Sequence, residues 1–139
     1  MIFRLERLVY QSTATGSTGS LLNIATILAE SQRNNGPRGL TGALAAHNEQ
    51  YIQVIEGAPH FLDGLLRRLQ GDGRHRNIVI LDRQPIPARS FGGWSMASAR
   101  ITPEQAPALD ALMAGDREAV DEVVAAMVAA LALDGSTRA

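Results

Sequence analysis

The chain has 139 residues, 45% of them hydrophobic and 19% charged, which fits a single soluble domain with a sizeable core. Its 13 basic and 14 acidic residues give a net charge of -1, so no bulk positive field attracts nucleic acid or an anionic membrane. Cysteine is absent, which excludes disulfides, thiolate metal sites and cysteine nucleophiles. The N-terminus shows no charged segment followed by an apolar run, as a signal peptide would have, and no run of about 18 apolar residues could span a bilayer. We therefore expect a cytoplasmic protein.

The N-terminal part of the chain predicts a strand, a loop and a helix. Residues 4–11 contain the apolar pattern of a strand, and the Ser-, Thr- and Gly-rich residues 12–19 predict a loop. A helix is predicted from Ser20, a good N-cap, to Asn35, because apolar residues recur there at spacings of three and four. The following Gly36 and Pro37 end it.

The middle of the chain predicts a second, similar unit. Its expected elements are, in order, strands over 40–46 and 51–57, a helix over 59–70, and strands over 78–82 and 91–99. The complete order is strand, helix, strand, strand, helix, strand, strand. This βαββαββ order predicts an α+β, ferredoxin-like sheet over residues 1–100, with both helices on one face.

Residues 101–139 predict a helical extension of this unit. Helices are expected over 103–113 and 116–133, and the second has valine, methionine and leucine at helical spacing. This apolar stripe requires a cover. It either caps the open face of the sheet or binds a second subunit. Because of this stripe, we expect a homo-oligomer. Residues 134–139 are expected to fray.

One polar residue stands out on an otherwise apolar strand face. Gln53 shares a face with Tyr51 and Ile55, because side chains alternate across a sheet. A buried amide without partners costs about 1–3 kcal/mol, so Gln53 requires a hydrogen-bonding neighbour. Tyr10, at the end of another apolar strand, is a candidate. The pattern therefore predicts a small polar site beneath the sheet.

Several sequence blocks occur in a characteristic order. They are Leu8-Val9-Tyr10-x-Ser12, Ser31-Gln32-Arg33-Asn34-Asn35, Leu40-Thr41-Gly42, Gln53-x-x-Glu56-Gly57, Asp72-x-Arg74-His75 and Phe91-x-x-Trp94-x-Met96. Together they resemble the BLUF domain, a class of blue-light sensors that use flavin. The resemblance covers residues 5–99. It implies a photoreceptor that binds flavin noncovalently: FAD, with FMN or riboflavin as alternatives.

The resemblance implies a photoactive pair. Tyr10 is similar to the family tyrosine that donates an electron, coupled to a proton, to the excited flavin. Gln53 is similar to the glutamine that bridges this tyrosine and the N5/O4 edge of the flavin. Its amide is expected to rotate or tautomerise, because one glutamine amide offers both a donor and an acceptor. The changed hydrogen bonding reddens the flavin spectrum.

The resemblance also implies a set of cofactor-binding residues. Asn35 matches the asparagine that fixes the polar edge of the ring, and Asn34 lies in the same block. Arg68 matches the arginine near the pyrimidine end of the flavin. Asp72 and His75 lie in the block beside the cofactor. Each of these residues alone also has a structural explanation, such as a helix C-cap for the asparagines and a turn for the aspartate.

The expected output is a signal rather than a product. Trp94 and Met96 match the pair whose placement relative to the flavin relays the signal. We expect no catalytic turnover, no metal and no nucleic-acid or membrane partner. The expected recipient is a downstream protein partner, reached through the C-terminal helices because no effector domain follows residue 139.

Two other functions fit parts of the sequence. A flavin-free ferredoxin-like module for dimerisation or ligand sensing fits the apolar C-terminal stripe equally well. A small enzyme of the acylphosphatase type requires an arginine in the loop after the first strand, and residues 12–19 contain none. Cofactor content separates the photoreceptor from the flavin-free module.

Overall fold

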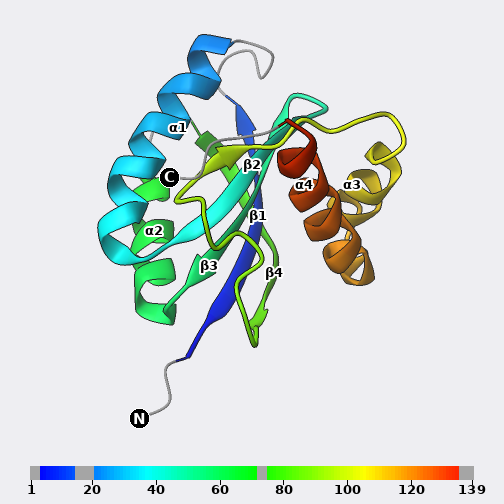
Figure 1. Cartoon of the computed structure of the whole chain (residues 1–139). Helices are drawn as coiled ribbons and strands as arrows, with labels where there is room; N and C mark the ends of the chain where they lie inside the picture. Colours follow the sequence, from blue (N-terminus) through cyan, green and yellow to red (C-terminus); the bar gives the residue numbers. More distant parts are fainter. Residues whose placement is uncertain (1–3, 15–20, 72–74, 135–139) are drawn as a thin grey trace.

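A computed structural model describes residues 4–14, 21–71 and 75–134, with the backbone alone at 14, 21–27, 75–76 and 133–134 (Figure 1). The described elements are, in chain order, β1 (Glu6–Ala14), α1 (Leu21–Asn35), the 3-10 turn η1 (Gly36–Arg38), β2 (Thr41–His47), β3 (Gln50–Gly57), α2 (Pro59–Gln70), β4 (His75–Pro85), β5 (Ala97–Ser98), α3 (Ala106–Met113), the 3-10 turn η2 (Arg117–Ala119) and α4 (Val120–Asp134).

The described strands form one five-stranded sheet in the order β4-β1-β3-β2-β5. Neighbouring strands are antiparallel, except that β5 runs parallel to β2. The first four strands have the order of a ferredoxin-like sheet, and α1 and α2 connect them as the βαββαβ pattern requires. The predicted α+β class is therefore confirmed.

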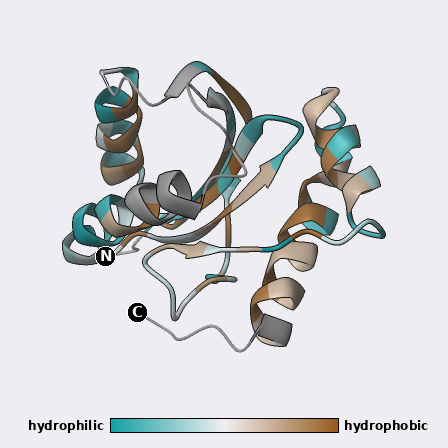
Figure 2. Ribbon diagram, turned by 90° about the horizontal axis from the view of Figure 1, so that it is seen from above, coloured by the Kyte–Doolittle hydropathy of each residue, from teal (hydrophilic) through white to brown (hydrophobic). Residues whose placement is uncertain are grey.

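The sheet is covered on both faces (Figure 1). One face packs with α2 and the end of α1 in a cluster that also contains Leu8, Tyr51 and Ile55. The other face, with Val9 and Val54, packs with α3 and α4. Figure 2 shows that much of the ribbon of the C-terminal helices has the colour of hydrophobic residues. The apolar stripe of α4 is therefore covered by the sheet of the same chain. The stripe no longer argues for a homo-oligomer.

The boundaries of several elements differ from those predicted. β1 extends to Ala14 and β4 covers His75–Pro85, since both pair along their whole length. Helix α3 begins only at Ala106, because the side chain of Gln105 accepts a hydrogen bond from the Thr102 amide and holds the preceding turn. The predicted N-cap Ser20 and the tail residues 135–139 lie outside the described residues.

The largest difference concerns the last strand. Residues 91–99 were expected to pair as one strand, but only Ala97–Ser98 do so. The preceding residues bind side chains of α1 and β3 and the edge of β2 instead, as described below. This irregular segment, residues 89–96, is called the connecting segment.

No described helix is both long and apolar enough to cross a bilayer.

Candidate functional site

Two polar side chains lie side by side at the centre of the face that carries α1 and α2. Tyr10 on β1 and Gln53 on β3 are direct cross-strand partners. Their residues are 1% and 2% exposed. Opposite residues of antiparallel strands point to the same face, with Cβ atoms about 4.5–5.5 Å apart. The predicted juxtaposition of Tyr10 and Gln53 is therefore present in the fold.

Apolar side chains surround this pair. Leu44, the partner of Gln53 on β2, lies on the same face. The other members of the buried cluster are Leu8, Leu40, Tyr51, Ile55, Leu62, Leu65, Leu69 and Met96, with Leu28 and Ile78 partly buried against it. Burial raises the pKa of Tyr51, so its phenol stays neutral. The result is an apolar region with a few fixed polar groups, which is typical of a cofactor site.

The C-terminal end of α1 supplies further polar contacts. Asn35 is 1% exposed, and its Nδ2 donates a hydrogen bond to the Ser95 carbonyl at 3.0 Å. Its Oδ1 is buried and has no hydrogen-bond partner in the described part of the chain. Gln32, one turn earlier, donates from Nε2 to the Met96 carbonyl at 3.0 Å. By contrast, the adjacent Asn34 is exposed and uses its backbone carbonyl to accept from Arg38.

The remaining predicted binding residues lie at the end of α2 and beyond it. Arg68 is exposed in the last turn of α2. Partial burial, together with the positive charges of Arg38 and Arg67, lowers its pKa. Such a concentration of guanidinium groups favours an anion nearby. Asp72 lies outside the described residues, and of His75 only the backbone at the start of β4 is described.

Trp94 and Met96 belong to opposite sides of the sheet. Met96 is buried in the cluster with Tyr10 and Tyr51. Trp94 is partly buried against the cluster that joins the sheet to α3 and α4. The connecting segment thus passes from one face to the other at the edge of β2. The Gly42 amide on β2 donates to the Trp94 carbonyl at 3.0 Å, and this fixes the crossing point.

Sequence reasoning assigned no role to Glu56, although the structure places it at a key position. The residue is fully buried on the face opposite Gln53. Its carboxylate accepts hydrogen bonds from the amides of Ser90 and Phe91 and from the Thr41 hydroxyl. The signal that could have revealed it is the one used for Gln53: a polar residue sharing a strand face with Ile52 and Val54.

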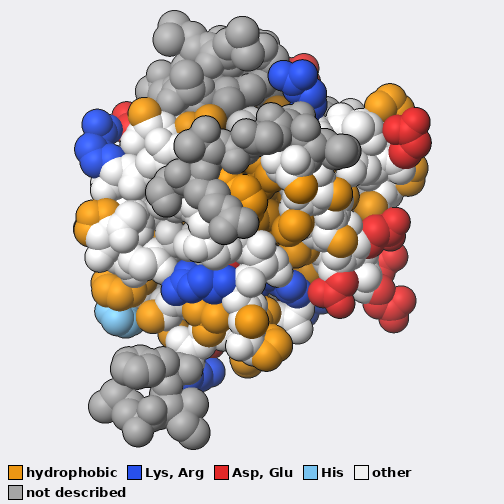
Figure 3. All heavy atoms as spheres, viewed as in Figure 1, with side chains coloured by type: hydrophobic (Ala, Val, Ile, Leu, Met, Phe, Trp, Pro, Cys, Tyr) orange, Lys and Arg blue, Asp and Glu red, His pale blue; other side chains and the backbone are white. Residues whose placement is uncertain are grey.

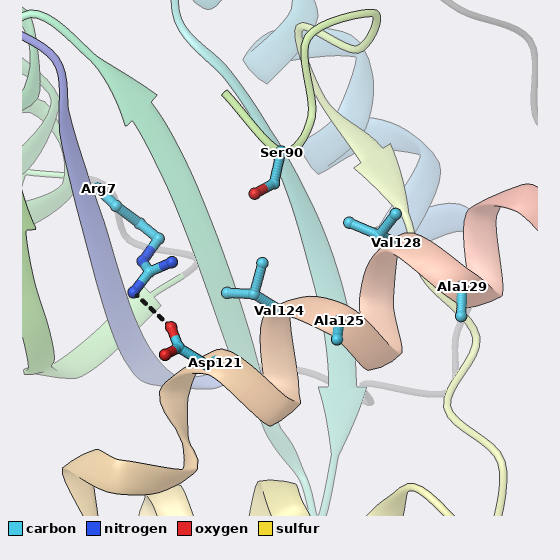
Figure 4. A pocket seen from close by; sticks show the side chains of 7 residues that line it. All are labelled: Arg7, Ser90, Asp121, Val124, Ala125, Val128 and Ala129. Atoms are coloured by element: carbon cyan, nitrogen blue, oxygen red, sulfur yellow. Dashed lines mark hydrogen bonds and ion pairs between the residues drawn. The ribbon is translucent and has the colours of Figure 1, made fainter. Parts of the chain in front are cut away.

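A separate hollow lies beside α4, away from the Tyr10–Gln53 pair (Figure 4). It measures about 500 Å³ and is lined by Arg7, Ser90, Asp121, Val124, Ala125, Val128 and Ala129. Arg7 is buried and contacts Asp121 at 3.2 Å, whereas the Asp121 side chain is 90% exposed. In the described ranges no three His, Cys, Asp or Glu side chains form a group able to hold a metal ion.

Comparison with known proteins agrees with this geometry. The sequence profile of BLUF, described as sensors of blue-light using FAD, matches residues 5–97. The chain belongs to the BLUF family. It therefore contains a blue-light sensing domain of the kind that binds flavin. The buried polar groups of this BLUF domain fit such a ring, because Asn35 Oδ1 is an acceptor at the edge of the apolar region that has no partner among the described residues.

Solved structures of BLUF proteins share the fold. The dark-state structure of the BLUF protein BlrB is 30% identical, with a TM-score of 0.75 over 93% of this chain and 98% of that chain. Klebsiella pneumoniae BlrP1 with FMN and cyclic diGMP is 27% identical, with a TM-score of 0.64 over 79% of this chain and 30% of BlrP1. This chain thus matches nearly the whole of one solved BLUF chain and less than a third of another.

Among curated proteins, the beta subunit of the photoactivated adenylate cyclase of Euglena longa is 30% identical over 104 residues. The match covers 70% of this chain and 11% of that subunit. The chain therefore spans about a tenth of the curated relatives that it matches. In the cyclases and in BlrP1, the light-sensing module is one part of a much larger protein.

Proposed function

We propose that the chain is a blue-light switch whose photoactive pair is Tyr10 and Gln53. The observation that carries this proposal is their direct pairing on one buried sheet face. A phenol can release and regain a proton, and a glutamine amide has a donor and an acceptor that can exchange places. Two such groups, isolated from water, form a hydrogen-bonding unit with two arrangements.

The switching step changes hydrogen bonds and leaves the covalent structure of the protein intact. A bound flavin would supply blue-light absorption and a strong electron acceptor. Tyr10 would give an electron and its hydroxyl proton to that acceptor and later regain both, so the cycle is redox-neutral. Gln53 reorients in the interval and is left in its second arrangement. Each net hydrogen bond is worth about 0.5–1.5 kcal/mol, enough to bias a balanced equilibrium.

Asn35 is the residue best placed to hold the polar edge of the flavin. It is buried, anchored through Nδ2 and left with an unpaired acceptor. Arg68 lies in the exposed last turn of α2, where partial burial and the like charges of Arg38 and Arg67 lower its pKa, and it is proposed to contact the pyrimidine end of the flavin. FAD is the proposed cofactor because the family is described as using it. Asp72 and His75 stay predictions as further contacts, and Asn34, whose side chain is exposed, is not part of the proposed set.

The proposed output runs through the connecting segment to α3 and α4. Met96 packs in the buried cluster that contains Tyr10, and Trp94 packs against the cluster that contains the apolar residues of α4. Figure 3 shows acidic side chains gathered over the C-terminal helices. The exposed acidic residues between the start of α3 and the first turn of α4 are Asp110, Asp116, Glu118, Asp121 and Glu122. A cytoplasmic protein partner with a basic surface fits this face. The domain acts as a regulator without turnover of its own.

The decisive experiment is the visible spectrum of the purified chain before and after blue light. We expect flavin absorbance with a reversible red shift, and extraction should release FAD rather than FMN or riboflavin. Colourless protein would favour the flavin-free module instead. Flavin absorbance without a red shift would refute the proposed switch.

Two variants assign the photoactive residues. Gln53→Leu and Tyr10→Phe replace the polar groups by apolar side chains of similar size, so both should retain flavin and lose the red shift. Gln50→Leu, at the partly exposed start of β3, is the matched control and should switch normally. A normal photocycle in either test variant would contradict the assignment. Sedimentation in the dark and in light then distinguishes a second copy of the chain from a different partner.

A further inference from the structure

We propose that Glu56 is the positioning residue that couples the photoactive pair to the connecting segment. This inference rests on the proposed function, and it adds a role that the Tyr10–Gln53 chemistry does not require. Glu56 lies three residues beyond Gln53 on β3, so the two side chains point to opposite faces of the sheet. Through its carboxylate, β3 holds the start of the connecting segment.

The contacts of Glu56 concentrate on two consecutive amides. Oε2 accepts from the Ser90 amide at 2.6 Å, and Oε1 accepts from the Phe91 amide at 3.0 Å. Oε1 also accepts from the Thr41 hydroxyl at 3.0 Å. The residue is 0% exposed, so these bonds do not compete with water. Hydrogen bonds to a buried carboxylate are about twice as strong as neutral ones.

A second group reinforces the same anchor. Arg89 Nη1 donates to the Glu56 backbone carbonyl at 3.1 Å and to Thr41 Oγ1 at 2.8 Å. Thr41 and Glu56 are cross-strand partners on β2 and β3. The start of the connecting segment is therefore bound to both strands. Phe91, whose amide is held by Glu56, is itself fully buried.

The other end of the connecting segment is bound to α1. Asn35 and Gln32 donate to the carbonyls of Ser95 and Met96. The segment is thus fixed at one end by the sheet and at the other by the helix beside the site. Movement at Met96 can displace Trp94 only if the start of the connecting segment, at Ser90 and Phe91, stays bound to β3. Glu56 supplies that fixed point, and this is why we infer a coupling role.

Glutamine at position 56 tests the role without creating a cavity. Two amide N–H groups face two different oxygens of Glu56. Glutamine has only one carbonyl oxygen, so either orientation turns its NH2 group toward one of these donors. The variant Glu56→Gln therefore loses at least one anchoring bond and leaves a buried donor unpaired. Its shape and volume are unchanged.

The measurement uses NMR on the flavin-loaded full chain, in the dark and in blue light. In Glu56→Gln we expect the Ser90 or Phe91 amide to exchange at least about tenfold faster, which corresponds to about 1.4 kcal/mol. The Ala99 amide, bound to Leu44, should keep its rate. Trp94 is the single tryptophan, so its indole gives one signal. Its light-induced shift should fall by about half or more while the flavin red shift persists.

Two further variants separate coupling from general damage. Glu6→Gln is the matched control, since Glu6 is also a buried carboxylate but binds Arg83 and Arg4. It should leave the Trp94 response intact. Arg89→Gln removes the reinforcing bonds from an exposed side chain, and it should weaken the Trp94 response even if Glu56→Gln does not fold.

Several results would overturn the proposal. They are unchanged exchange at both Ser90 and Phe91, a Trp94 response equal to that of the original chain in both Glu56→Gln and Arg89→Gln, or loss of the red shift together with the Trp94 response. Failure of the proposed function is distinguishable, because it removes the red shift from the unsubstituted chain. The amide exchange in the dark still tests the anchor in that case.

Discussion

Replacing Asn35 by leucine tests whether α1 contributes the acceptor that binds the flavin edge. The Asn35 side chain donates one hydrogen bond, from Nδ2 to the Ser95 carbonyl, and its buried Oδ1 has no partner among the described residues. Leucine gives up the bond, worth about 0.5–1.5 kcal/mol, and removes an acceptor whose burial costs about 1–3 kcal/mol. These effects oppose each other. We therefore expect the change in the free energy of unfolding without flavin to lie between a loss of about 0.5 kcal/mol and a gain of about 2.5 kcal/mol.

Flavin affinity should respond much more strongly. If the flavin supplies the missing partner of Asn35 Oδ1, binding recovers the desolvation cost of about 1–3 kcal/mol, which leucine cannot recover. The expected loss is about 5- to 150-fold in Kd, since about 1.4 kcal/mol corresponds to tenfold. Titration of flavin into the flavin-free protein, followed by flavin fluorescence, measures this directly. Urea unfolding of the same sample gives the stability.

The neighbouring asparagine provides the control. Asn34 is exposed, and its backbone carbonyl accepts a hydrogen bond from Arg38. Asn34→Leu should bind flavin within about twofold of the unsubstituted chain, which is under 0.5 kcal/mol. An equal loss in both variants would mean that leucine near the end of α1 acts nonspecifically. Normal affinity in Asn35→Leu would refute the reasoning outright.

Three further predictions concern the sheet and its covers. Because burial raises the pKa of Tyr51 above 10.0, the unfolded chain ionises first, and stability should fall as pH rises beyond that value. Urea unfolding at about pH 9 and about pH 11 measures how far the free energy of unfolding falls with pH. For Tyr51→Phe this fall should be shallower than for the unsubstituted chain, by up to about 1.4 kcal/mol per pH unit. Equal slopes in the two proteins would contradict this prediction. Met127→Ala removes a fully buried side chain between α4 and the sheet and should lower the free energy of unfolding by about 2–5 kcal/mol. Circular dichroism and Trp94 fluorescence should report the same single transition. Separate transitions would mean that α4 unfolds independently of the sheet. Gly42→Ala places a Cβ against the Val54 carbonyl oxygen and should cost about 1–3 kcal/mol and move the Trp94 indole NMR signal; an unmoved signal would argue against this crossing point.

Periodicity predicted the regular part of the fold well. The helix over Pro59–Gln70 has the predicted boundaries, because proline opens it and a leucine stripe with one buried face runs to its end. The same alternation rule placed Gln53 on the face of Tyr51 and Ile55. Local patterns suffice in these cases because each element buries a single, continuous side.

The irregular segment was beyond such reasoning. Residues 91–96 have no ladder partner, and their amides and carbonyls bind Glu56, Gly42, Asn35 and Gln32 instead. These partners come from three distant elements. Nothing in the spacing of residues along the chain specifies such contacts, because a side-chain acceptor can replace a strand neighbour only after the elements have assembled.

The amino-acid sequence by itself determined the α+β class, the alternation that buries Gln53 and the family blocks around Tyr10. Tertiary structure decided which polar groups meet: the register that sets Tyr10 against Gln53, and the burial that separates Asn35 from Asn34. It also decided that Met96 and Trp94 face opposite sides of the sheet. The physical reason is that periodicity selects a face within one element. Register, burial and hydrogen-bond pairing arise only between elements, where buried polar groups must find partners.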